Sequence, residues 1–219
     1  MLPARHHPRS SMSLDGFSKV ARAFSHRNYA IYAAGSCLSL IGKLVQMAAV
    51  GWLTWRLTGS VTWVSIMAVA DMGPSLLSPI GGVFADRLNK QWMFFWLQAA
   101  AMGQAIALSV LTLTGLITVE ILFALTLVLG TLMAFSHPVR MALIPSLVAR
   151  EDLPTAIALT SVVFNIAMFV GGGIGGFIIA MWSVGAAFLF NAVCFLGVLG
   201  ALASLRLPRE VRRVGRQTK

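Results

Sequence analysis

Six long apolar runs constrain the fold of this chain more than any other feature of its sequence. About 20 consecutive apolar residues cross the hydrocarbon core of a bilayer as an α-helix, and a helix satisfies its own backbone polar groups where water is absent. Hydrophobic residues make up 58% of the chain and charged residues 11%, whereas soluble domains carry about a quarter charged residues. We therefore predict an all-α integral membrane protein whose six transmembrane helices occupy residues 29–57, 61–85, 91–114, 116–136, 153–181 and 183–207.

The basic residues predict the direction in which these helices cross the membrane. Lys and Arg gather in the N-terminal segment, in the second and fourth links between the runs, and in the tail, whereas Arg56 lies in the other set of links and Lys43 inside a run. Because cytoplasmic loops carry the excess of Lys and Arg, we expect both termini in the cytoplasm. The chain then divides into a basic N-terminal segment, a six-helix bundle and a basic tail, at 1–28, 29–207 and 208–219.

Composition and spacing disfavour several classes of function. A net charge of +10 could attract nucleic acid, but basic residues that flank apolar runs are placed by membrane topology, so we expect no nucleic-acid partner. The four histidines lie in or beside expected cytoplasmic segments, and the two cysteines and the histidines show no metal-ligand spacing. The sequence has no G-x-S-x-G nucleophile motif and no filter-like loop typical of a channel. We expect neither an enzyme nor a bound cofactor or metal.

Two charged residues inside apolar runs are the first candidates for a functional site. Lys43 lies 14 residues past Tyr29, and Asp71 lies 15 residues before Asp86, which places each about 21 to 22 Å from the same membrane face at about 1.5 Å per residue. The two residues therefore share a depth. A charge at the bilayer centre costs at least about 3 kcal/mol, so both side chains are expected to face the bundle interior or a wet cavity.

Polar neighbours at helical spacing extend each charge into a stripe. On the first helix the stripe comprises Ser36, Ser39, Lys43 and Gln46, and on the second helix it comprises Asp71, Ser75 and Ser78. We expect both stripes to line a cavity, with Asp71 as a proton-linked carboxylate and Lys43 as a charge that tunes it or meets an anionic substrate. Alternatively, the two form a buried ion pair that only orders the bundle. Asn165 is a weaker pathway candidate, and interhelical hydrogen bonding is the default role for Gln98 and Gln104.

The stretch GGVFADRLNKQW, residues 81–92, places glycine and charge between two apolar runs. Asp86 would lie at a helix C-terminus, where the helix dipole disfavours a carboxylate, so we expect it to need a cation or a helix N-terminus from elsewhere. Gly82, four residues earlier, would let a neighbouring helix approach. Gly82, Asp86 and Arg87 resemble the G-x-x-x-D-R/K start of the major facilitator superfamily signature. Asn89 replaces the next glycine of that signature, and asparagine tolerates a left-handed turn.

Two further stretches resemble the drug- and siderophore-exporter branch of that superfamily, the enterobactin-exporter-like group. Residues 137–159 are similar to its link between the fourth and fifth helices, whose P-x-R-x-x-L-x-P-x-L-V core is matched by Pro138, Arg140, Leu143, Pro145, Leu147 and Val148. The GGGIGG run is similar to the glycine motif on the fifth helix of exporters, through Gly171, Gly175 and Gly176. Packing of helices through small residues explains the same glycines, so packing and gating roles both stay open.

The resemblance implies both an architecture and a function. The fold would be a three-plus-three inverted repeat of six helices, which is one half of a twelve-helix major facilitator transporter, and 208–219 would begin the linker to the other half. The function would be secondary active transport in a bacterial cytoplasmic membrane, with proton-coupled efflux of a small organic molecule such as a drug or siderophore. The residues of the gating motif would be Gly82, Asp86, Arg87, Arg140, Gly171, Gly175 and Gly176.

A six-helix half leaves three alternatives open for the activity of this chain. It could be a fragment that lacks its partner half, or a half-transporter that assembles as a homodimer or with a separate second chain. It could also be a membrane scaffold that transports nothing. In a half that stands alone, the polar stripes would face lipid, which is costly for Lys43 and Asp71.

Overall fold

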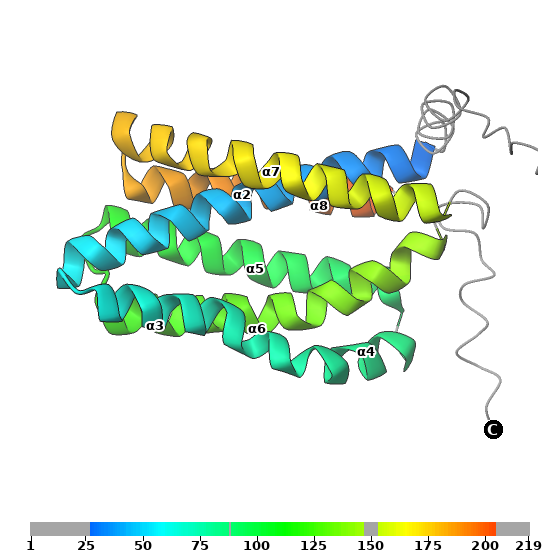
Figure 1. The fold of residues 1–219 in the computed structure, drawn as a ribbon, viewed down its shortest axis with the longest axis horizontal. Helices are drawn as coiled ribbons and strands as arrows, with labels where there is room; N and C mark the ends of the chain where they lie inside the picture. The colour runs from blue at the N-terminus through cyan, green and yellow to red at the C-terminus, as the bar shows by residue number, and fades with distance from the viewer. Residues whose placement is uncertain (1–26, 88, 147–152, 205–219) are drawn as a thin grey trace, which may run out of the picture.

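The structure, a computed structural model, describes residues 27–87, 89–146 and 153–204, and every regular element in these ranges is helical. Six of its helical stretches are long and apolar enough to cross a membrane, which confirms the predicted all-α fold with six spans. In chain order the elements are α2 (Arg27–Thr58), α3 (Val61–Met72), η1 (Gly73–Leu77), α4 (Ser78–Arg87), α5 (Lys90–Leu113), α6 (Val119–Leu143), η2 (Ile144–Ser146), α7 (Leu153–Met181) and α8 (Val184–Ser204). Figure 1 shows them side by side in one bundle.

The second span is not a continuous α-helix. It consists of α3, the 3₁₀ turn η1 and α4, and Pro74 lies in the first turn of η1. Proline has no backbone N–H and its ring clashes with the preceding turn, so it interrupts an α-helix. The α4 segment consequently leaves the direction of α3 in Figure 1.

The fourth span is longer than the sequence predicted. Residues 137–159 were expected to link the fourth and fifth helices, but α6 continues through Pro138 to Leu143. Val139 and Leu143 are fully buried in a core cluster, and this packing holds the last turns helical despite the proline, as tertiary context often overrides local propensity. Arg140 therefore lies in the last helical turn and not in a link.

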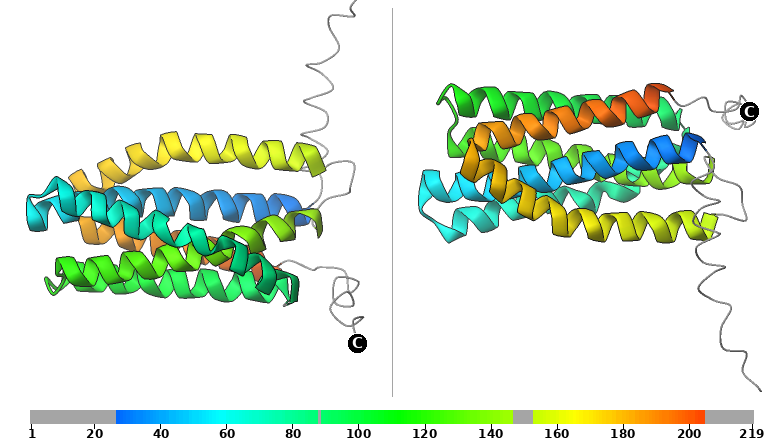
Figure 2. Two further views of the ribbon diagram at one scale, coloured as in Figure 1. Left: turned by 60° about the horizontal axis from the view of Figure 1, so that its bottom comes forward. Right: turned by 90° about the horizontal axis from the view of Figure 1, so that it is seen from above.

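The packing of the six spans follows the inverted repeat. The first span, α2, packs on the fifth and sixth spans, α7 and α8. The fourth span, α6, packs on the second span, which runs from α3 to α4, and on the third span, α5. The third and sixth spans, α5 and α8, pack on each other, and Figure 2 shows them on the same side of the bundle. Exchanging the first three spans with the last three reproduces these neighbours, which is the relation expected of a three-plus-three repeat.

Local side-chain caps define where two of the helices begin. The side chain of Asn89 accepts hydrogen bonds from the backbone N–H groups of Gln91 and Trp92, 3.2 and 3.4 Å away, and so caps the N-terminus of α5. Its backbone is extended, with φ −68° and ψ 106°, so Asn89 does not adopt the left-handed conformation that asparagine tolerates. Thr118 caps α6 in the same way.

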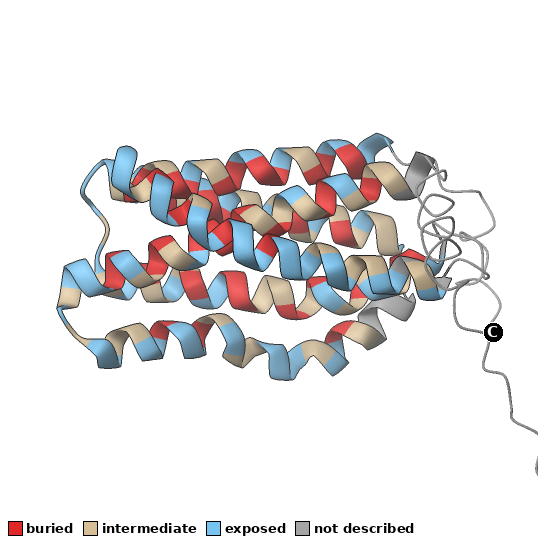
Figure 3. Cartoon of the chain, turned by 45° about the horizontal axis from the view of Figure 1, so that its top comes forward, coloured by how far each residue is buried: buried red, intermediate tan, exposed pale blue. Residues whose placement is uncertain are grey.

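Burial is uneven among the spans. In the most apolar stretch of each span, 50% of α8 and 44% of α2 is buried, against 22% of α7 and 11% of the span 61–82. Figure 3 shows the buried residues concentrated where the helices face one another. The helices α3, α4 and α7 thus present the least covered surfaces of the described chain.

Candidate functional site

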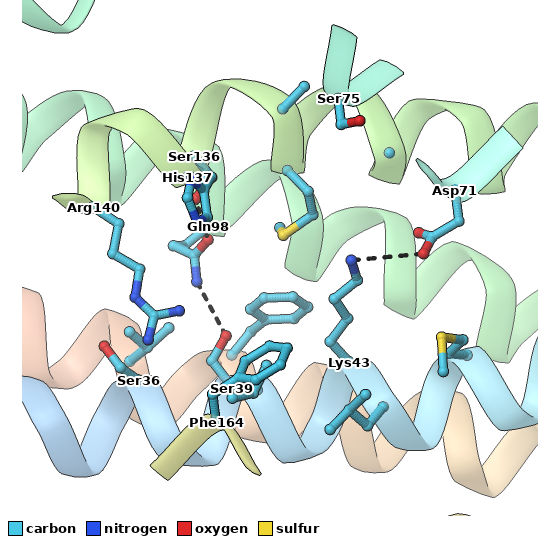
Figure 4. A pocket seen from close by; sticks show the side chains of 18 of the residues that line it. Ser36, Ser39, Lys43, Asp71, Ser75, Gln98, Ser136, His137, Arg140 and Phe164 are labelled. Carbon is cyan, nitrogen blue, oxygen red and sulfur yellow. Dashed lines mark hydrogen bonds and ion pairs between the residues drawn. The ribbon is translucent and has the colours of Figure 1, made fainter. Parts of the chain in front are cut away.

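A cavity of about 550 Å³ lies in the middle of the bundle, and all six spans contribute to its wall. This volume is in the usual range for small-molecule sites, roughly 300 to 1,000 Å³. Its polar lining consists of Ser36, Ser39, Lys43, Asp71, Ser75, Ser78, Gln98, Ser136, His137 and Arg140. Its apolar lining includes Phe94, Phe164, Phe195, Met133 and Met168. Figure 4 shows the polar side chains reaching into this space from several helices.

Lys43 and Asp71 face each other across the cavity. The Nζ atom of Lys43 lies 3.6 Å from Oδ2 of Asp71, and the two side chains are 27% and 15% exposed. The two residues thus meet at one level, as their helical positions predicted. The separation is that of an ion pair and exceeds the usual hydrogen-bond length of about 2.7 to 3.2 Å. The ion pair leaves both groups in contact with the cavity (Figure 4).

Gly130 on α6 allows the close helix contact that positions Asp71. A Cβ atom at this position would lie 2.6 Å from the backbone carbonyl oxygens of both Ala70 and Asp71. No side chain larger than hydrogen fits there without moving α3, because backbone atoms cannot rotate out of the way. The contact therefore fixes the backbone of Asp71 against α6.

A second group of polar side chains forms a hydrogen-bonded chain across three helices. Ser136 on α6 donates to Oε1 of Gln98 on α5, and Nε2 of Gln98 donates to Oγ of Ser39 on α2, each at 3.2 Å. The hydrogen bond between Gln98 and Ser39 is drawn in Figure 4. Gln98 thus has the interhelical role expected for it, and it also lines the cavity.

The third group, His137 and Arg140, lines the cavity from α6. The apolar pattern predicts both residues in or beside a cytoplasmic link, and the family resemblance implies a gating role for Arg140. The sequence does carry a signal for this placement, which is the helical period of α6. The residues of one helix face follow at spacings of three and four and are Gly130, Met133, His137 and Arg140.

Two buried polar atoms at this end of the cavity have no partner. The Nε of Arg140 and the hydroxyl of Ser36 are buried and make no hydrogen bond. Within the described ranges, no ion pair engages Arg140. Buried polar groups are hydrogen-bonded in the great majority of cases, so these two atoms are unusual.

Gln46 lies outside the cavity, contrary to the expected polar stripe. Its side chain is 1% exposed. It accepts from Nδ2 of Asn191 at 2.6 Å and donates to Oε1 of Gln104 at 3.1 Å, while Gln104 donates to the carbonyl of Leu125 at 3.0 Å. These bonds join α8, α2, α5 and α6, so the contacts of Gln46 are those of helix packing, and Gln104 has the interhelical bonding expected of it.

Asn165 also does not line the cavity. Its side chain is exposed on α7 and donates to the backbone carbonyl of Ser161 one turn earlier, at 2.8 Å. Of the predicted pathway residues, the structure therefore brings Ser39, Lys43, Asp71 and Ser75 together around one cavity. It does not bring Gln46 or Asn165 to it.

The glycines of the expected gating motif differ in their surroundings. A Cβ atom at Gly171 would lie 2.7 Å from Cβ of Leu44, and one at Gly175 would lie 3.3 Å from Cα of Val45, so both glycines let α7 approach α2. Nothing lies within 4 Å of a Cβ atom at Gly176. Gly171 and Gly175 thus have contacts typical of helix packing.

Close approach near the second link occurs at Gly81 and not at Gly82. A Cβ atom at Gly81 would lie 3.1 Å from Cα of Phe135 on α6, whereas one at Gly82 would meet nothing within 4 Å. The expectation that Gly82 admits a neighbouring helix is therefore wrong within this chain. The side chains of Asp86 and Arg87, which would complete the motif, lie outside the described residues.

Comparison with known proteins identifies the family. Residues 19–218 match the transmembrane secretion effector family of the major facilitator superfamily. The chain is 24% identical to the staphyloferrin A transporter of Staphylococcus aureus over 84% of this chain and 46% of that protein. It is 26% identical to YfiS, an uncharacterized major facilitator-type transporter of Bacillus subtilis, over 81% and 41% of the two chains. It is 30% identical to a putative multidrug resistance protein, MdtD of Yersinia enterocolitica, over 65% and 29%.

These matches agree with the six-span fold and with the resemblance found in the sequence. The chain spans less than half the length of the curated relatives it matches. The matched region extends over the whole described bundle. The chain is therefore a multi-pass membrane protein that belongs to the transmembrane secretion effector family of major facilitator transporters, a family of transporters and not of enzymes.

Proposed function

We propose that this chain forms the N-terminal half of a secondary active transporter and that its cavity is part of the transport pathway. The observation that carries the proposal is the ion pair of Lys43 and Asp71 in the wall of a central cavity. Charged groups inside a membrane bundle are costly and mark substrate or ion pathways. A pair that only orders the bundle would not need to line such a space.

The proposed coupling ion is the proton, and its proposed carrier is Asp71. The Asp71 carboxyl is 15% exposed and pairs with Lys43 at 3.6 Å. Protonation would weaken the attraction between the two side chains and so change how firmly α2 and α3 are held together. Ser39 and Ser75 line the cavity with this pair and would solvate the substrate or the proton.

The proposed cargo is a small organic molecule, and the proposed direction is efflux. The names of two relatives support this choice, because one is the staphyloferrin A transporter and another a putative multidrug resistance protein. The mostly apolar wall, with phenylalanine and methionine side chains, also suits an organic body.

The proposed location is the cytoplasmic membrane of a bacterium, with both termini in the cytoplasm. The relatives are bacterial. The ends of the described helices that carry Arg27, Arg87, Lys90 and Arg140 lie at one end of the bundle, and Arg56 lies at the other (Figure 1). The excess of basic residues at one end supports this orientation.

The proposed partner is a second six-helix half, supplied in the same polypeptide, by a separate chain or by a second copy. The least covered surfaces belong to α3, α4 and α7, and Met72, Phe164 and Met168 from α3 and α7 both line the cavity and are exposed. A second half on this side would enclose the cavity. Gating by Gly82, Asp86, Arg87 and Gly176 would then act between the halves.

A fragment or scaffold without transport activity is the alternative. The observation that favours it is that the chain spans less than half the length of its curated relatives. In that case the cavity would have no opposite wall, and the ion pair of Lys43 and Asp71 would serve stability alone.

Transport by reconstituted protein tests the proposal. The chain would be placed in liposomes with and without a co-expressed second half, and export of dyes and organic acids would be followed under an imposed pH gradient. We expect gradient-dependent transport that Asp71→Asn abolishes and Arg56→Gln, at the exposed end of α2, leaves intact. If Asp71→Asn retains full proton-coupled transport, the proposed role of Asp71 is wrong, and if neither preparation transports any compound, the scaffold alternative is favoured.

A further inference from the structure

The charges of the cavity wall do not balance among the described residues. Its cationic side chains are Lys43 and Arg140, with His137 beside them, whereas its carboxylate is Asp71. Asp71 is already paired with Lys43. The guanidinium of Arg140 is therefore the permanent charge that the described wall leaves without a counterion.

The surroundings of Arg140 are those of a binding site for an oxyanion. Figure 4 shows its side chain extending from α6 toward Ser36 on α2. The Nε of Arg140 and the hydroxyl of Ser36 are both buried without a hydrogen-bond partner. The planar guanidinium offers paired N–H donors that match the two oxygens of a carboxylate, and a serine hydroxyl can donate a further hydrogen bond.

Ser39 adds a third donor beside this pair. Its hydroxyl oxygen accepts from Gln98, which in turn accepts from Ser136. This chain orients the Ser39 oxygen and leaves its own O–H free to donate into the cavity. Lys43 cannot replace Arg140 in this role, because Asp71 already offsets its charge.

The remainder of the wall defines the rest of the ligand. Phe94, Phe164, Phe195, Met133 and Met168 surround the space, and flat aromatic or aliphatic bodies pack well against such side chains. A cation would meet two basic side chains there, and a strongly hydrated polyanion would have to leave water for an apolar wall.

We propose that Arg140, Ser36 and Ser39 form an oxyanion subsite, so that the cavity takes mainly apolar organic molecules with a single carboxylate. This proposal rests on the proposed transport function for its biological meaning, but binding itself requires neither a gradient nor a second half. The same oxyanion chemistry would fit the phosphate of a lipid headgroup, and the test must separate the two sources.

Binding of a matched pair of probes tests the subsite. The purified full chain in phosphatidylcholine nanodiscs would be titrated with radiolabelled 2-naphthoate and with 2-naphthamide, which has the same ring system without the charge. Because charge-assisted hydrogen bonds are roughly twice as strong as neutral ones, we expect naphthoate to bind at least about tenfold more tightly. Equal affinity for the two probes in the unmodified protein would overturn the proposal without any mutation.

Variants then assign the preference to Arg140. Arg140→Gln should reduce naphthoate affinity about tenfold, to the level of the amide, and Arg140→Lys should restore part of it. Arg56→Gln, which removes an exposed charge at the other end of α2, should change nothing. A naphthoate preference that survives in a folded Arg140→Gln protein, as judged by its melting temperature, would refute the assignment.

A lipid arm separates the two sources of oxyanion. The titration would be repeated in phosphatidylglycerol nanodiscs. After correction for surface charge, the naphthoate affinity should stay within about threefold of its value in phosphatidylcholine nanodiscs. If phosphatidylglycerol instead blocks naphthoate in the unmodified protein, the site belongs to a lipid headgroup and the substrate assignment fails. Transport of neutral compounds without naphthoate preference would refute this subsite alone, whereas naphthoate binding without any transport would refute the proposed function alone.

Discussion

Gly130 lies so close to Asp71 that a Cβ atom on the glycine would be 2.6 Å from the aspartate's backbone carbonyl oxygen. The carboxylate of the same aspartate pairs with Lys43. One residue of α3 is thus held from two sides, through its backbone by α6 and through its side chain by α2. Changes in either contact should affect the other.

Replacing Gly130 with alanine should therefore destabilise the protein. The new methyl group must push α6 from α3, and overpacking of this kind typically costs about 1 to 3 kcal/mol. The matched control is Gly103→Ala on α5, where nothing lies within 4 Å of the added carbon. Thermal unfolding in a neutral detergent should show a lower midpoint for Gly130→Ala and no loss for Gly103→Ala. Equal midpoints for the two variants would show that the α3 and α6 backbones can separate freely.

Removing one charge of the Lys43 and Asp71 ion pair should destabilise the protein more than removing both charges. In Lys43→Met the carboxylate is left without its counterion, in Asp71→Asn the ammonium is, and in the double variant neither charge remains. Removing one partner of a buried pair costs about 3 to 5 kcal/mol, and the cavity should reduce this figure because both side chains are partly exposed. We expect the double variant to melt above at least one single variant. Strictly additive losses in the double-mutant cycle would mean that the two charges do not interact.

The architecture could be predicted from the sequence because a bilayer permits few alternatives. Runs of apolar residues specify helices, and Lys43 and Asp71 could be placed at one depth because a helix has a fixed rise. The paired charges in the cavity wall follow from these two rules. Ser39 and Ser75 were found by helical spacing from the same two residues.

The parts that could not be predicted depend on how the helices rotate and pack. Gln46 belongs to the predicted polar stripe of α2, yet its side chain contacts Gln104 and Asn191 and not the cavity. The stripe covers more than one face of the helix, so its residues cannot all face the same cavity. The apolar run that ends at residue 136 and the resemblance of 137–159 to a link both predict Arg140 outside the helix, whereas the buried contacts of Val139 and Leu143 extend α6 past it. Such long-range contacts have no signature in a single sequence.

Two glycines of one helix should respond differently to the same substitution. In Gly171→Ala the added carbon would lie 2.7 Å from Cβ of Leu44, which a rotamer change cannot move, whereas in Gly176→Ala it would meet nothing within 4 Å. Gly171→Ala should therefore lower the melting midpoint, and Gly176→Ala should leave it unchanged or raise it slightly, because alanine favours a helix over glycine by about 1 kcal/mol. Loss of transport in a Gly176→Ala protein of normal stability would assign that glycine to gating.

The orientation of the bundle can be tested by labelling single cysteines from outside the cell. In a chain without Cys37 and Cys194, cysteines would be introduced at Ser60 and Leu116, in the turns at one end of the bundle, and at Pro145, at the other end. Leu116 and Pro145 are exposed and Ser60 is partly exposed. If the basic end faces the cytoplasm, a membrane-impermeant maleimide should label Ser60→Cys and Leu116→Cys in intact cells and Pro145→Cys only after the cells are permeabilised. The reverse pattern would overturn the proposed orientation and would place the Arg140 end of the cavity at the outer face of the membrane.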